Sequence, residues 1–137
     1  MSYRIGDLSY NIATTSTTIP DKAAAFNASF KINGSSLANF VPSWSGKFDY
    51  YFAHFSSYPK KPYLDFVLYS PSAANYTNIK LPDFSKYLGI SKVDLNSLSL
   101  NSFGLYQVDG FDETKFYYKD GLFNSSNFNG KSVTRNY

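Results

Sequence analysis

Few side chains in this sequence could move protons. His54 is the only imidazole and lies between Ala53 and Phe55 in an aromatic segment, cysteine is absent, and Glu113 is the single glutamate among ten acidic residues. Nucleophilic catalysis needs a base beside its partner, and paired-carboxylate hydrolysis needs two acids that face each other. The positions of His54 and of the acidic residues in the sequence indicate neither arrangement. We therefore expect His54 to be structural or exposed, no catalytic residues, no cofactor and no enzyme activity; an enzyme that uses scattered aspartate pairs is the weaker alternative.

The densest acidic group is Asp109, Asp112 and Glu113, in the segment Asp-Gly-Phe-Asp-Glu. Carboxylates and carbonyls in a turn are the hard oxygen ligands that calcium prefers. The spacing matches no complete calcium-binding loop. Solvated acids around a hairpin turn are the preferred interpretation, and a metal site at these three residues is the alternative.

Aromatic residues make up 20% of the chain, and three of them lie in segments typical of exposed loops. Trp44 lies between Pro-Ser and Ser-Gly, and Tyr58 and Tyr63 flank the segment Pro-Lys-Lys-Pro. A ring face can stack on the C–H face of a sugar while nearby polar groups bind the hydroxyls. These three rings are the predicted ligand-binding residues, with glycans as the ligand. The alternative for Trp44 is a plug at one end of the core, since Trp is highly buried on average.

The net charge of +3 comes from 13 basic and ten acidic residues that are spread along the chain. Lys60 and Lys61 form the only adjacent basic pair, which is too little for a phosphate-binding surface, so nucleic acid is not an expected partner. No stretch approaches the roughly 18 apolar residues of a membrane span. The given chain shows no signal peptide at Met1. We expect a virion component, or an extracellular or cell-surface protein whose leader was removed.

The elements that must hold these side chains are strands. Helix-favouring residues are scarce, and period-two alternation bounded by turn dipeptides predicts a series of short strands. The predicted strands cover 8–13, 26–32, 37–41, 48–55, 64–69, 98–108, 115–118, 122–123 and 131–134. One short helix is expected between Pro82 and Gly89, and Asn33-Gly34 predicts a tight turn.

This pattern predicts an all-β fold: a single two-sheet antiparallel sandwich over residues 1–137, of jelly-roll or immunoglobulin-like type. Residues 1–20 are expected to include an extended N-terminal arm. Tyr10, Ile12 and Ile19 lie in this β-prone, Thr-rich segment, which could pair with the sheet edge of a neighbouring subunit. An ordinary first strand is the alternative.

Composition and predicted fold together favour a role in binding other molecules over a role in catalysis. We expect a non-catalytic structural or assembly protein, such as a component of a virion capsid, a filament or a surface layer, which binds itself or other structural proteins. The alternative is a carbohydrate-binding or adhesive surface module that uses the predicted ligand-binding rings.

Overall fold

Antiparallel strands make up most of the described part of the chain. The computed structural model describes residues 2–13, 26–61, 63–72, 94–112 and 130–137. Within these ranges helix is limited to two 3₁₀ turns, η1 (Leu37–Asn39) and η2 (Leu95–Ser97). The predicted all-β sandwich is confirmed. The predicted helix at 82–89 and the predicted strands at 115–118 and 122–123 lie outside the described residues.

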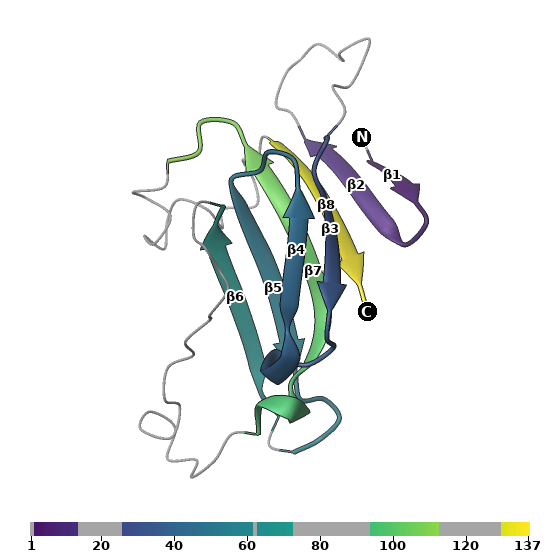
Figure 1. Cartoon of the computed structure of the whole chain (residues 1–137), viewed down its shortest axis with the longest axis vertical. Helices are drawn as coiled ribbons and strands as arrows, with labels where there is room; N and C mark the ends of the chain where they lie inside the picture. Colours follow the sequence, from purple (N-terminus) through teal and green to yellow (C-terminus); the bar gives the residue numbers. More distant parts are fainter. Residues whose placement is uncertain (1, 14–25, 62, 73–93, 113–129) are drawn as a thin grey trace.

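Two sheets of unequal width form the sandwich (Figure 1). The larger sheet has six strands in the order β1-β2-β8-β7-β5-β6, and the smaller one pairs β3 with β4. All neighbouring strands are antiparallel. The strand bounds are β1 (Ser2–Ile5), β2 (Leu8–Ala13), β3 (Ser29–Asn33), β4 (Val41–Ser45), β5 (Tyr50–Ser56), β6 (Asp65–Pro71), β7 (Ser99–Val108) and β8 (Gly130–Asn136).

Aromatic rings fill the space between the two sheets. Tyr51, Phe55 and Phe103 are fully buried on the side of the larger sheet that faces β3 and β4. The Phe103 ring meets Phe30 of β3 edge-on, with centroids 4.7 Å apart, and Phe40 meets Phe55 at 5.1 Å. Face-to-face sheets lie about 10 Å apart, a gap that large side chains from both layers fill. The abundance of Phe and Tyr is thus explained in part by this single interlayer core.

The connection between β3 and β4 is longer than the sequence predicts. An antiparallel hairpin does form, with Asn33 opposite Val41, but the predicted strand at 37–41 is wrong, because Leu37–Asn39 form η1 and the second strand is Val41–Ser45. Gly34 has a φ of +84°, a conformation that favours glycine, yet the chain continues through η1 instead of closing a two-residue turn. The predicted tight turn is therefore wrong. The physical reason is burial, because the longer connection brings Leu37 and Phe40 into the core.

The six-stranded sheet is wider than the pair of strands that covers it. In Figure 1, β3 and β4 lie in front of β5 and β7, whereas the β1–β2 hairpin lies to the right of β3. Pro71 ends β6, which is the opposite edge of the sheet in the described residues, and proline is tolerated at sheet edges. Both edges of the larger sheet therefore extend past β3 and β4.

Candidate functional site

The connection between β5 and β6 carries two exposed tyrosines. Tyr58 and Tyr63 are 76% and 59% exposed, and their ring centroids lie 6.0 Å apart at 31°. Lys60 and Lys61 are exposed between them, and the Lys61 ammonium lies 5.7 Å from the centroid of the Tyr63 ring. We call these four residues the two-tyrosine site. The two-tyrosine site combines two exposed aromatic rings with two positively charged side chains.

Partly buried hydrogen bonds hold the backbone of this connection. Ser57 is only 3% exposed, and its hydroxyl accepts a hydrogen bond from the Leu64 amide at 2.8 Å and donates to the Lys60 carbonyl at 3.3 Å. The Lys60 amide donates to the Ser57 carbonyl at 2.7 Å, and the Tyr58 amide donates to the Ser56 hydroxyl at 3.0 Å. The rings therefore project from a backbone that is fixed at both ends.

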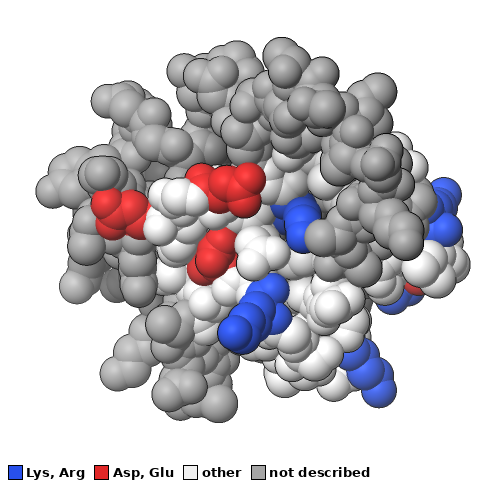
Figure 2. Space-filling model, turned by 90° about the horizontal axis from the view of Figure 1, so that it is seen from above, with Lys and Arg blue, Asp and Glu red and all other residues white. Residues whose placement is uncertain are grey.

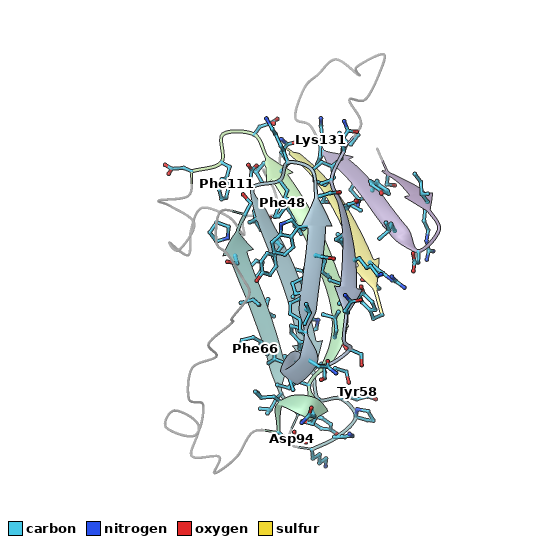
Figure 3. The ribbon with its side chains drawn as sticks, viewed as in Figure 1. Phe48, Tyr58, Phe66, Asp94, Phe111 and Lys131 are labelled. Atoms are coloured by element: carbon cyan, nitrogen blue, oxygen red, sulfur yellow. The ribbon has the colours of Figure 1, made fainter. Side chains whose placement is uncertain are left out.

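Trp44 does not belong to this site. Its ring is half-buried on β4 and lies 5.4 Å from both Phe48 and Tyr51, measured between centroids. Figure 3 shows Phe48 near the upper end of the sandwich and Tyr58 at the lower end. The structure therefore brings Tyr58 and Tyr63 together but separates Trp44 from them. The position of Trp44 matches the alternative interpretation, a plug at one end of the core.

The acidic turn follows β7 at the upper end. Asp109 is exposed and Asp112 is half-buried, while Glu113 lies outside the described residues. Figure 2 shows the upper face, with acidic side chains on the left and the lysines and arginines toward the middle and right. In the described ranges, no three His, Cys, Asp or Glu side chains are grouped so that they could hold a metal ion. A metal site that includes Glu113 stays a prediction.

A second aromatic surface, which was not among the predicted sites, lies on the outer face of the large sheet, the face turned away from β3 and β4. The rings of Tyr50 and Tyr106 stack at 4.9 Å with an interplanar angle of 3°, and Phe52 meets Tyr69 at 5.2 Å. Burial raises the pKa of the hydroxyls of Tyr50, Tyr106 and Tyr69. Alternation in the aromatic segment places Tyr50 and Phe52 on one face, but their partners on β6 and β7 follow only from the strand order.

His54 lies on the same outer face and is hydrogen-bonded. Its Nε2 atom is 3.0 Å from Oδ1 of Asp65 on β6, and Ser102 is its register partner on β7. Within the described residues, the hydrogen-bond partner of the His54 ring is Asp65, and no hydrogen bond joins the ring to Ser102. The absence of enzyme activity stays a prediction.

The predicted arm begins as a strand of the large sheet. Tyr10 pairs with Val133 and Ile12 with Lys131, both on β8 of the same chain. Ile19 lies outside the described residues. Residues 9–13 therefore pair with a strand of their own chain. Pairing with a neighbouring subunit stays a prediction for the remainder of the arm.

Comparisons with protein-family models, with curated proteins and with solved structures found no match to this chain. Among the described residues, no helix has the length and apolar character needed to cross a membrane.

Proposed function

We propose that the protein is a non-catalytic structural or assembly component that acts through protein–protein contacts. The observation that carries this proposal is an exposed isoleucine on the core-facing side of the β1–β2 hairpin, at the edge of the larger sheet. Ile5, next to the turn of that hairpin, is 62% exposed. It is one of the few large apolar side chains in the described residues that are more than half exposed.

The register of the hairpin explains why Ile5 is exposed. Ile5 lies opposite Leu8, and residues directly opposite in neighbouring strands share a face. Leu8 and Tyr10 share that face by alternation, and Tyr10 lies opposite the fully buried Val133. Ile5 therefore lies on the side of the sheet that carries the core. It is exposed because the hairpin extends beyond β3 and β4 (Figure 1).

The edge strand of the larger sheet is a second feature that favours association between chains. β1 is the terminal strand of the larger sheet in the described part of the chain. An edge strand presents unpaired backbone N–H and C=O groups that can pair with a strand from another chain. Backbone pairing at this edge, together with burial of Ile5, would supply both direction and affinity to an assembly contact.

Measuring the mass in solution over a wide concentration range tests this proposal. We expect the wild-type chain to associate and Ile5→Arg to shift it toward the monomer, because a buried arginine without a partner opposes association. Val41→Arg is the matched control, since Val41 on β4 is 58% exposed but lies on the other sheet. A chain that stays monomeric at every concentration, or equal effects of the two variants, would contradict the proposal.

A second candidate function is a carbohydrate-binding or adhesive surface module. The two-tyrosine site favours it, because two exposed rings on a fixed backbone bring contact area at low entropic cost. This function does not require the hairpin contact, and the two can be tested separately.

A further inference from the structure

We propose that the two-tyrosine site binds an acidic oligosaccharide, one whose sugar rings carry carboxylate or sulfate groups. The inference rests on the second candidate function above and adds the chemical class of the ligand. It is carried by three features of the site: the exposed rings, two lysines that form no ion pair with a described carboxylate, and the hydrogen-bonded backbone on either side of them.

The ring geometry excludes a nucleobase inserted between the two tyrosines. A base held between two rings needs roughly twice the 3.4 Å stacking distance. The centroids of Tyr58 and Tyr63 are only 6.0 Å apart, so no base fits between them. Both rings are more than half exposed, although the Lys61 ammonium lies over the Tyr63 ring, and the negative electrostatic potential of an exposed ring face attracts the positively polarised C–H groups of a pyranose.

The two lysines supply a charge that the described residues do not neutralise. Neither the Lys60 nor the Lys61 ammonium is paired with a carboxylate in the described part of the chain. Asp94 lies at the same end of the molecule (Figure 3). Its carboxylate caps η2, where it accepts a hydrogen bond from the Asn96 backbone amide at 3.0 Å. An anionic group on the ligand would therefore meet two available cations beside the rings.

The number of charges argues against a phosphate polymer. Binding along a nucleic-acid backbone requires several cations, because each neutralised phosphate contributes a similar share of the affinity. Two lysines provide two such contacts at most. A short acidic saccharide needs only one or two cations beside an aromatic surface, which is what this site offers.

The fixed backbone lowers the cost of binding. Ser57 ties Lys60 and Leu64 together through its hydroxyl and its carbonyl, so the backbone at these positions is restrained before the ligand arrives. A site that is ordered in advance loses less conformational entropy on binding. Modest contact area can therefore give measurable affinity.

Titration calorimetry with four probes tests the inference on the full chain. Oligogalacturonate supplies carboxylates, dextran sulfate supplies sulfates, neutral dextran supplies sugar without charge, and poly(dT) supplies phosphates. We expect one or both acidic saccharides to bind about tenfold more tightly than neutral dextran, and added salt to weaken that binding. Binding of one acidic probe alone would identify which anionic group the site prefers.

Paired variants assign the binding to this site. Lys60→Gln with Lys61→Gln should weaken acidic probes about tenfold and leave neutral dextran unchanged. Lys31→Gln with Lys47→Gln is the matched control, because both lysines are exposed elsewhere and the net charge falls equally. Tyr58→Ala with Tyr63→Ala should weaken every saccharide. All these side chains are exposed, so we expect the thermal unfolding midpoint to stay close to that of the wild type.

Each adverse outcome has a distinct meaning. Equal weakening by the two lysine pairs would overturn the inference in favour of diffuse electrostatic attraction. Equal affinity for neutral dextran would refute the acidic class yet leave the carbohydrate-binding function intact. No binding to any saccharide would overturn both, and tighter binding of poly(dT) that depends on the same two tyrosines would replace the ligand with a nucleic acid. The association test on Ile5 is independent of all of these outcomes.

Discussion

Tyrosine side chains serve two roles in this protein. Tyr58 and Tyr63 present their rings to solvent, whereas Tyr50 is buried on the outer face of the larger sheet and stacks on Tyr106. Burial opposes the tyrosinate anion, so the pKa of Tyr50 lies above its ordinary value of 10.0; nearby Tyr106, Tyr69 and Asp49 raise it further. A buried hydroxyl of this kind makes stability sensitive to alkaline pH.

Replacing Tyr50 with phenylalanine should reduce that sensitivity. In the unfolded chain the hydroxyl ionises near its ordinary pKa of 10.0, while in the folded chain it stays protonated to higher pH. The unfolded state therefore binds fewer protons above that value, and stability falls as pH rises. We expect a declining urea midpoint above about pH 10 and a shallower decline for Tyr50→Phe. Tyr58→Phe, at an exposed ring, is the control, and an identical slope in all three proteins would contradict the role of Tyr50.

At the element scale, the strands follow from burial patterns that a single sequence reveals. β2, β5, β6, β7 and β8 fall on segments whose alternation predicts them, because one face or both faces of these strands are buried. β1 was not predicted, since it is a four-residue edge strand with little burial to leave a pattern. The order of the strands was also beyond a local pattern, because pairing joins segments far apart in the chain, such as β2 with β8.

The candidate site was predictable only in part for the same reason. Tyr58 and Tyr63 flank a short Pro-Lys-Lys-Pro segment, so their proximity follows from local sequence. Trp44 reaches a different end of the sandwich because β4 packs on β5, and no local pattern specifies that packing. The hydrogen bond between His54 and Asp65 depends likewise on the pairing of β5 with β6.

Gly104 on β7 provides an element-scale prediction. A Cβ atom at this position would lie 2.8 Å from Cγ2 of Thr134 on β8 and 3.0 Å from the Tyr106 ring, so the outer face has no room for it. We expect Gly104→Ala to lower the free energy of unfolding by about 1–3 kcal/mol. Combining it with Thr134→Ser, which removes Cγ2, should restore part of that loss. Urea denaturation of both single variants and the double variant measures the coupling, and strictly additive effects would show that the contact is unimportant.

The two proposed contact surfaces, the two-tyrosine site and the β1–β2 hairpin, lie in different parts of the molecule and serve different roles. The two-tyrosine site lies at the lower end of the sandwich beside η2, whereas the β1–β2 hairpin lies at one lateral margin of the larger sheet (Figures 1 and 3). A chain could therefore associate through its margin while its end stays open to a ligand. This separation allows assembly and ligand binding to operate in the same molecule.

Amide hydrogen exchange at two protein concentrations tests the assembly half of this arrangement. β5 and β7 are paired on both sides and carry the core, so their amides should exchange most slowly, and those of β1 should exchange fastest in dilute solution. If association covers the hairpin, protection of β1 should rise with concentration. β6 is the internal control, because it lies at the opposite edge of the sheet in the described residues. Protection that rises at β6 instead of β1 would move the interface to the other margin and overturn the role given to Ile5.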